Sequence, residues 1–354
     1  MTDVESSLTA VRPAHRFDEG RLVAYLAGHL GDLGAVTVRQ FQGGQSNPTF
    51  RLDTRAGRLV LRKKPPGPLL PSAHQVEREF RIITALHGSG VPVPRPLLLC
   101  EDTEVIGTAF YVMEHVEGRI LSRPELGGLD PGERRAVYDA MNATLAALHR
   151  IDWAALGLGD FGRTDRYLAR QIARWTRQYR ASLVGAADPA MEDLMVWLEE
   201  NIPADGTVAI AHGDFRLGNL IFAPDAPRVA AVLDWELSTL GDPLGDLAYC
   251  CLPYRLPAGA AGVKGLGGLD LGALGIPGEE AFVADYCRRT GRDGIAGWTF
   301  YLAFALFRLA AILQGVHARA VQGNASSADA LEVGQRARLL ARTAHALAFA
   351  QGNG

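Results

Sequence analysis

The stretch AIAHGDFRLGNLIF, residues 209–222, places a histidine, an aspartate and an asparagine between apolar residues. Asp214 comes two residues after His212, Asn219 comes five residues after Asp214, and a second apolar run, VAAVLDW, contains Asp234. An aspartate is ionised at neutral pH because its ordinary pKa is about 3.9, so Asp214 could accept a proton from a hydroxyl group. The Asn219 amide oxygen and the Asp234 carboxylate are ligands that a hard cation such as Mg²⁺ prefers.

Taken alone, His-Gly-Asp is typical of a turn, in which the aspartate bonds to nearby backbone N–H groups. The added Asn219 and the downstream Asp234, each at the edge of an expected strand, favour a chemical site over a plain turn. The spacing is that of a kinase catalytic loop followed by its metal-binding aspartate. It predicts phosphoryl transfer to a hydroxyl group, with Asp214 as the base and Asn219 and Asp234 as Mg²⁺ ligands.

The elements that would position these residues differ along the chain. The first third predicts a helix over residues 16–33, an amphipathic helix over 73–90 and a small antiparallel sheet. The expected strands of this sheet cover 35–41, a hairpin over 49–64, and then 91–100 and 108–116.

After Gly118 the pattern becomes mostly helical. Long helices are expected over 131–150, 163–183, 189–201, 279–290, 298–321 and 328–351, and strands only over 208–234. The 354 residues exceed what a single core usually supports. We therefore expect an α+β fold with a small antiparallel-sheet lobe over 1–113, a hinge over 114–118 and a larger, mostly helical lobe over 119–354. A cleft between lobes would suit a ligand, and the Gly-rich stretch 260–275 predicts a mobile loop.

Composition narrows the function classes. The net charge of −3 shows no large basic excess, so we expect no nucleic-acid partner. The apolar run 298–316 is interrupted by Arg308 and Gln314, which predicts a core helix and no membrane span. The acidic N-terminal residues lack the apolar segment of a signal peptide, and the four cysteines lack metal-site spacing. We expect buried, reduced thiols and a cytoplasmic location.

The phrases HGDFRLGN and LDWE resemble the aminoglycoside phosphotransferase family of small-molecule kinases, whose fold is related to that of protein kinases. Gly213 stands where protein kinases have arginine, as is typical of that family. LDWELSTLGDPLGDLAY, GGQSNPTF and LRKKPPGPLLPSAHQVERE are similar to one branch, which includes the kinase-like domain fused to some animal acyl-CoA dehydrogenases. The resemblance covers about residues 20–320. It implies a two-lobe kinase-like fold, ATP and Mg²⁺ as cofactors, and a hydroxylated small molecule as acceptor.

The resemblance also implies residues that hold the nucleotide. GGQSNPT lies between the first two strands, where a loop would cover the phosphates. Gly44 permits close backbone approach there, and Ser46 and Asn47 offer hydrogen-bond donors. In the connector YVMEHVEG, Met113 would border the pocket. The adenine would face the backbone carbonyl of Glu114 and the backbone N–H of Val116.

A cation on the third strand should reach the phosphates. The family register places Arg62 there, with Val60 over the adenine, and Lys63 is the second choice. Glu79 of the following helix would orient that cation. Asp246 would brace the catalytic loop.

Several functions remain in competition. A kinase with ATP or GTP is the first. A nucleotide-binding protein without turnover would more readily have lost the three residues Asp214, Asn219 and Asp234, and a metal-dependent hydrolase would need more histidine and aspartate. An aminoglycoside-type antibiotic kinase should have an acidic acceptor region. The helix over 298–321 instead carries basic side chains, among them Arg308, which favours an anionic or apolar acceptor such as a hydroxy acid or a hydroxyacyl thioester. The role of Glu236 is open.

Overall fold

The computed structural model describes the chain except for residues 1, 4–7, 43–46, 68–73, 205, 260–263, 322–329 and 351–354. Contacts divide the chain into two compact units. The first comprises Met1–Ser122, Leu156–Leu158 and Leu217–Ser238, and the second comprises Arg123–Ala155, Gly159–Arg216 and Thr239–Gly354. The domain boundaries expected at residues 113 and 119 stay a prediction.

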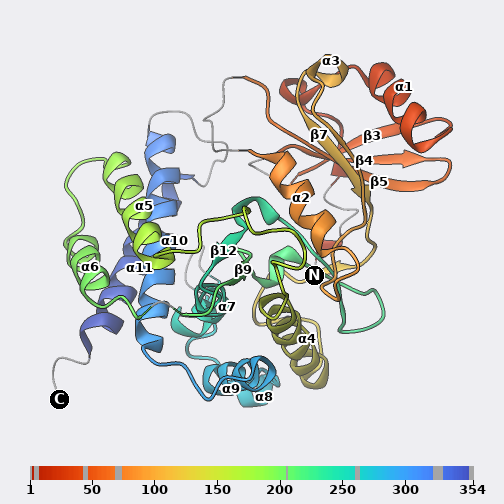
Figure 1. The fold of residues 1–354 in the computed structure, drawn as a ribbon. Helices are drawn as coiled ribbons and strands as arrows, with labels where there is room; N and C mark the ends of the chain where they lie inside the picture. The colour runs from red at the N-terminus through yellow and green to blue at the C-terminus, as the bar shows by residue number, and fades with distance from the viewer. Residues whose placement is uncertain are drawn as a thin grey trace. The chain divides into compact units, whose positions relative to one another are not determined.

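The first unit contains a six-stranded antiparallel sheet in the order β2-β3-β4-β5-β7-β6 (Figure 1). Its strands are β2 (Leu8–Thr9), β3 (Thr37–Phe41), β4 (Thr49–Thr54), β5 (Gly57–Lys63), β6 (Pro96–Cys100) and β7 (Phe110–Glu114). Among the described residues, four helices accompany them: η2 (Pro13–His15), α1 (Glu19–Leu30), α2 (Val76–Leu86) and α3 (Thr103–Ile106). This sheet confirms the strands expected in the first third of the chain.

Alternation along the strands gives this sheet two different faces. On one face Phe50, Leu61 and Val112 are fully buried, in one apolar cluster with Leu22 and Leu26 of α1. The other face packs against α2, which contacts β6 and β7. Arg62 follows Leu61 and Tyr111 precedes Val112 along their strands. The side chains of Arg62 and Tyr111 therefore lie on the α2 side of the sheet.

A second sheet of the first unit has the order β1-β8-β10-β11. Its strands are β1 (Thr2–Asp3), β8 (Arg119–Ile120), β10 (Leu220–Phe222) and β11 (Val229–Val232). A side chain at Gly118 would place its Cβ 2.2 Å from the Phe222 carbonyl oxygen, so glycine is required where β8 approaches β10. Two short helical turns frame the last two strands: η3 (Leu217–Asn219) leads into β10, and η4 (Trp235–Leu237) follows β11.

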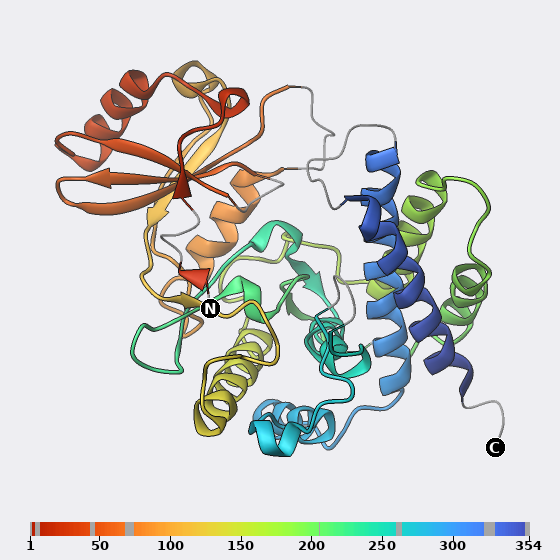
Figure 2. The same ribbon diagram turned by 180° about the vertical axis from the view of Figure 1, so that it is seen from behind.

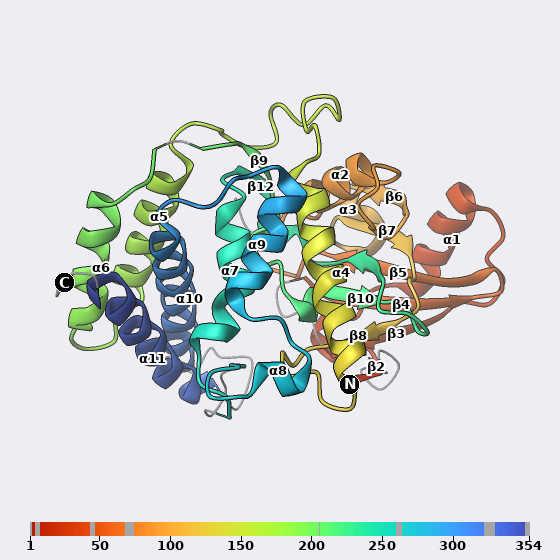
Figure 3. The ribbon, with the colours of Figure 1, turned by 90° about the horizontal axis from the view of Figure 1, so that it is seen from below.

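The second unit is mostly helical, as the sequence predicts (Figure 3). Its helices are α4 (Pro131–His149), α5 (Tyr167–Ala181), α6 (Pro189–Glu200), α7 (Leu244–Arg255), α8 (Leu271–Leu274), α9 (Glu279–Thr290), α10 (Trp298–Val321) and α11 (Ala330–Phe349). Helices α10 and α11 lie side by side (Figure 2), and α10 also contacts α5 and α7. A short antiparallel pair, β9 (Ala209–Ala211) with β12 (Thr239–Gly241), completes the unit.

Helix α10 is long and apolar enough to cross a membrane, but 67% of its most apolar 18-residue segment is buried inside the structure. This burial agrees with the expected core helix. The Gly-rich stretch expected as a mobile loop contains regular structure in its described part, because α8 lies within it and Pro257 pairs with Gly267. All four cysteines are buried and free, as expected.

Candidate active site

A cavity of about 340 Å³ lies within the first unit, between the α2 side of the six-stranded sheet and the strands β10 and β11. Apolar side chains form most of its wall, among them Val60 of β5, Ile221 of β10 and Val232 of β11. An apolar cavity of this size, with a few polar groups at one end, suits a small ligand such as a nucleotide. Seven residues predicted from the sequence line it: Val60, Arg62, Met113, Glu114, Val116, Asn219 and Asp234.

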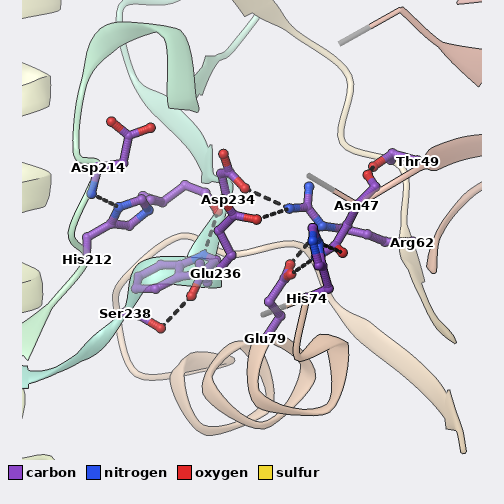
Figure 4. A network of polar contacts seen from close by, with 12 residues as sticks. Asn47, Thr49, Arg62, His74, Glu79, His212, Asp214, Asp234, Glu236 and Ser238 are labelled. Carbon is purple, nitrogen blue, oxygen red and sulfur yellow. Dashed lines mark hydrogen bonds and ion pairs between the residues drawn. The ribbon is translucent and has the colours of Figure 1, made fainter. Parts of the chain in front are cut away.

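Arg62 is the central cation of this cavity (Figure 4). Its Nε lies 2.8 Å from Glu79 Oε2, and its Nη2 donates a hydrogen bond to Asp234 Oδ1 over 2.7 Å. Glu236 Oε2 lies 3.6 Å from the same Nη2. Burial alone would lower the pKa of Arg62, but the negative charges of these carboxylates raise it, so the guanidinium stays charged.

Lys63, the alternative cation, follows Arg62 on β5 and therefore points to the opposite face of the sheet. Its side chain is buried, and its Nζ lies 5.6 Å from the centre of the Phe17 ring. Burial lowers the pKa of Lys63. The structure thus brings Arg62, and not Lys63, to the cavity with Glu79 and Asp234.

Glu79 of α2 is buried and has three polar partners. It is ion-paired with Arg62, the Asn47 amide donates a hydrogen bond to its Oε1 over 2.7 Å, and the Tyr111 hydroxyl donates one to its Oε2 over 3.1 Å. Burial raises the pKa of Glu79, and the Arg62 charge together with these hydrogen bonds opposes the rise. A buried carboxylate with all of these partners holds Arg62 in one orientation.

Asn47 therefore has a different contact from the one the sequence suggests. Its amide nitrogen is directed at Glu79, and its Oδ1 lies 3.1 Å from Nδ1 of His74 (Figure 4). The donation of a hydrogen bond from Asn47 to phosphate stays a prediction. Gly44 and Ser46, the other two expected loop residues, lie outside the described residues.

Asn219 and Asp234 reach the cavity from the two helical turns. Asn219 is the last residue of η3, and its carbonyl accepts a hydrogen bond from the N–H of Leu233 over 2.8 Å. Asp234 has a φ of 68°, a left-handed conformation that is uncommon for aspartate. This backbone bend places the Asp234 carboxylate at the cavity wall, where strained residues often serve function.

Asp214 belongs to the second unit and follows β9. Asp246, in the first turn of α7, holds the loop around Asp214. Its carboxylate accepts hydrogen bonds from the N–H of His212 over 2.6 Å and from the N–H of Gly213 over 2.9 Å. His212 is fully buried, and its Nδ1 accepts a hydrogen bond from the Asp214 N–H over 3.1 Å (Figure 4). These contacts agree with the bracing role expected for Asp246, and they give His212 the same role.

Behind Asp246 lies a further buried histidine, His149 of α4. Its Nε2 is 3.4 Å from Asp246 Oδ2, and its Nδ1 is 2.8 Å from the Tyr286 hydroxyl. Burial alone would raise the pKa of Asp246, but His149 and the backbone donors lower it, so the carboxylate stays ionised and keeps its hold on the loop. His149 was not singled out from the sequence, where it is only a histidine at the end of an expected helix.

Two residues that the sequence did not single out contact the Asp214 carboxylate. Arg216 Nε lies 3.2 and 3.1 Å from its two oxygens, and burial together with the nearby Asp214 charge raises the pKa of the Tyr249 hydroxyl. Arg216 stands inside the motif HGDFRLGN and could have been noticed there. Tyr249 comes three residues after Asp246, so the turn of α7 that carries the bracing aspartate also carries this hydroxyl.

Residues 37–304 match the family described as Phosphotransferase enzyme family. The chain is 47% identical over 344 residues to acyl-CoA dehydrogenase family member 10 of Mus musculus, a match that covers 97% of this chain and 32% of that protein. The chain thus spans about a third of that relative's length.

A solved protein of Ralstonia eutropha, provisionally assigned as an aminoglycoside phosphotransferase, is 49% identical with a TM-score of 0.85, over 94% of this chain and 98% of that one. Aminoglycoside phosphotransferase APH(4)-Ia, solved in a ternary complex with AMP-PNP and hygromycin B, has a TM-score of 0.59 at 15% identity, over 92% and 98% of the two chains. At that identity the likeness shows the fold alone. Together these findings confirm the predicted α+β, protein-kinase-like fold and the resemblance read from the motifs.

Proposed function

Because the chain belongs to the phosphotransferase enzyme family, we propose that it is an ATP-dependent kinase that transfers the γ-phosphate to a hydroxyl group of a small molecule. The observation that carries this proposal is Arg62, which lines one cavity with Asn219 and Asp234. Its guanidinium is ion-paired with Asp234 and with Glu79. A cation for the phosphates, a carboxylate that orients it and oxygen ligands for a metal are the parts that phosphoryl transfer needs.

The nucleotide would occupy the cavity of the first unit. The adenine would lie against Val60 and Met113, with the backbone of Glu114 and Val116 as its hydrogen-bond partners. Arg62 would bind the phosphates, and Glu79 would keep its guanidinium in place.

The donor set at the end of the cavity fits Mg²⁺. Within the described residues no group of three or more His, Cys, Asp or Glu side chains is arranged for a metal. Asn219 and Asp234 nevertheless supply an amide and a carboxylate oxygen at the same cavity, and Mg²⁺ usually binds through one or two such ligands, with phosphates and water completing its shell. When bound, Mg²⁺ would neutralise charge on the phosphates. Glu236, which lies close to Arg62, is a further candidate ligand.

Asp214 would act on the acceptor. Its carboxylate would take the proton of the acceptor hydroxyl while that oxygen bonds to the γ-phosphorus and the bond from the γ-phosphorus to the bridging oxygen of ADP breaks. Asp246 and His212 fix the loop backbone, so the carboxylate is held before the acceptor arrives. Tyr249 and Arg216 restrict its orientation further.

For the acceptor we propose a hydroxy acid or a hydroxyacyl thioester. Helix α10 carries basic side chains in an otherwise apolar sequence, which disfavours a polycationic antibiotic. The similar mouse protein is named for acyl-CoA chemistry, which agrees with an acyl acceptor. An aminoglycoside-type kinase and a nucleotide-binding protein without turnover are the alternatives. We further propose a cytoplasmic enzyme that needs neither nucleic acid nor a membrane.

The test is acceptor-dependent release of ADP from Mg²⁺-ATP, measured with a panel of hydroxy acids, their coenzyme A thioesters and aminoglycosides. Stimulation by the first two classes supports the proposal, and stimulation by aminoglycosides alone would establish the antibiotic kinase. Nucleotide binding without stimulation by any hydroxylated compound would favour the protein without turnover. The same assay with GTP decides the nucleotide preference.

A further inference from the structure

Arg308 is a buried cation in the apolar helix α10, and its side chain is surrounded by aromatic rings. The residue is 9% exposed. Its guanidinium carbon lies 5.4 Å from the centre of the Trp175 ring and 5.8 Å from that of Tyr249. One nitrogen donates a hydrogen bond to the Gly213 carbonyl, whereas the buried Nε has no hydrogen-bond partner among the described residues. A buried donor without a partner is costly, and a ligand would remove that cost.

A second guanidinium lies at the same indole. Arg174 precedes Trp175 on α5, and its guanidinium carbon is 5.1 Å from the centre of the Trp175 ring. Loss of hydration and the positive charge of Arg308 lower the pKa of Arg174. Two positive charges are thus close enough to repel each other, although Arg174 remains accessible from solvent.

Carboxylates pair with two other arginines of α5 but not with Arg174, and none pairs with Arg308 of α10 among the described residues. Arg170 forms an ion pair with Asp165 over 3.4 Å, and Arg180 forms one with Glu192 over 3.4 Å. Within the part of the chain that the structure describes, no carboxylate forms an ion pair with Arg174 or with Arg308. The repulsion between them is therefore left to be offset by an anion from outside the chain.

The position of the pair connects it to catalysis. Arg308 donates a hydrogen bond to the carbonyl of Gly213, the residue before Asp214, and also lies over the ring of Tyr249, whose side chain is near the Asp214 carboxylate. An anion bound by the pair would lie beside the loop that acts on the acceptor hydroxyl. A molecule that carries both a hydroxyl and an anionic group could occupy both places at once.

We propose that Arg174 and Arg308 form the binding site for an anionic group of the acceptor, a carboxylate or a phosphate, and so select acceptors that carry a negative charge near the reacting hydroxyl. This inference rests on the proposed kinase function and adds the residues that decide its substrate class. Arginine suits the task because its planar guanidinium offers paired donors to carboxylate and phosphate oxygens and stacks on aromatic rings.

The substitution that tests this site is Arg174→Gln, because Arg174 contacts the Trp175 ring and leaves the catalytic loop untouched. The matched control is Arg177→Gln, which removes an equal charge from an exposed position one turn later on the same helix. Each protein is assayed for ADP release with a hydroxy acid, with its coenzyme A thioester and with the diol in which a hydroxymethyl group replaces the carboxylate. Binding of the hydroxy acid is also measured by calorimetry, without turnover.

In the unsubstituted enzyme the charged acceptors should have the higher kcat/KM. Arg174→Gln should lower kcat/KM for them by about tenfold to a hundredfold, the scale of one hydrogen bond to a charged group, and should leave the diol within about twofold. Preference for the free acid identifies a carboxylate as the bound group, and preference for the thioester identifies a phosphate of the carrier. Arg308→Lys, which keeps the charge but loses the planar stack, should reduce the same preference.

Equal kcat/KM for the diol and the charged acceptors in the unsubstituted enzyme would overturn the inference. So would an equal effect of Arg174→Gln and Arg177→Gln, because the loss would then reflect net charge and not a site. If no acceptor of any class stimulates ADP release, the kinase proposal fails, and calorimetry still decides on the anion site. Loss of hydroxy-acid binding in Arg174→Gln alone would support the site, and unchanged binding would overturn it.

Discussion

The guanidinium of Arg62 donates a hydrogen bond to the Asp234 carboxylate over 2.7 Å while it is ion-paired with Glu79 over 2.8 Å. Asp234 is also the proposed anionic ligand of Mg²⁺, so a cationic side chain and a divalent ion would share one carboxylate. The phosphates of ATP would resolve this competition, because they bring negative charge for Arg62 at the same time as oxygen ligands for the metal. Nucleotide and metal should therefore bind together.

Mg²⁺-ATP should raise the melting temperature of the protein. A ligand that binds only the native state stabilises it by about 2.7 kcal/mol at one hundred times its dissociation constant. In Asp234→Asn the part of this shift that depends on Mg²⁺ should weaken, because a neutral amide replaces an anionic ligand. Thermal shift assays with ATP plus Mg²⁺ or plus EDTA measure the two parts separately.

The matched control is Asp225→Asn, which changes an exposed aspartate between β10 and β11. This variant should keep both the Mg²⁺-dependent and the Mg²⁺-independent part of the melting-temperature shift. Absence of any shift with saturating Mg²⁺-ATP or Mg²⁺-GTP would contradict the nucleotide site.

Arg62→Ala should raise the KM for ATP and lower turnover, because the charge that positions the phosphates is lost. A loss of kcat/KM of about a hundredfold is expected, the scale of one electrostatic contact to the transferred group. Lys63→Ala should have a much smaller effect on both constants, since Lys63 points to Phe17 on the other face of the sheet. Steady-state kinetics on the two variants measures these effects. A larger loss in Lys63→Ala than in Arg62→Ala would mean that Lys63, and not Arg62, binds the phosphates.

Lys63 also makes a prediction about stability. Burial lowers its pKa in the folded protein, so between that lowered value and the unfolded value of about 10.4 the unfolded chain holds more protons. Stability of the unsubstituted protein should therefore rise with pH across this window. Lys63→Met removes the buried charge, and should be more stable at pH 7 by the order of 1 kcal/mol, the usual scale of single substitutions.

The advantage of Lys63→Met should shrink as the pH rises towards 10.4, which urea unfolding at pH 7 and pH 10 would measure. Lys64→Met is the control for loss of a neighbouring charge, because Lys64 is half-buried and ion-paired with Glu77. A Lys63→Met protein that is less stable than the unsubstituted one at pH 7 would mean that the buried ammonium is favourable.

Local signals allowed the helices to be predicted closely. Asp130 and Glu133 form a capping box at the start of α4, and Pro131 occupies its first turn, so the sequence already contains the beginning of that helix. The bounds of α9 and α10 likewise agree with those expected from periodicity. The short strands β8 and β12 could not be found in this way, because strands of two or three residues form only when distant segments pair: Thr239 of β12 lies opposite Ala211.

The candidate site shows the same division. Residue types and spacing were enough to select Asn219 and Asp234, and the register of the resembling family selected Arg62. The structure brings all three to one cavity. They could not show that the Asn47 amide is directed at Glu79, because that contact depends on how α2 packs against the sheet. Contacts of this kind join residues far apart in the chain, and they cannot be predicted from the local pattern of a single sequence.

The sharpest prediction concerns Asp214. Asp214→Asn removes the proton acceptor but keeps the size of the side chain, and Asn219 and Asp234 remain for the metal. The dissociation constant for Mg²⁺-ATP, measured by thermal titration, should change by no more than a few-fold. Acceptor-dependent ADP release should fall by at least the 10²–10⁴-fold typical of the loss of a general base. The fall should exceed that range if Asp214 also orients the hydroxyl, because the contacts from Arg216 and Tyr249 hold a carboxylate there.

The matched control for this substitution is Asp293→Asn, an exposed aspartate of the same unit that should keep both nucleotide binding and turnover. Nucleotide affinity that persists while turnover is lost would separate a base from a residue that merely shapes the loop, since a shaping residue would also disturb folding or binding. An Asp214→Asn enzyme that kept more than about a tenth of the acceptor-dependent rate would fall far short of the loss expected for a base, and Asp214 would then be only a turn residue of the loop that Asp246 braces.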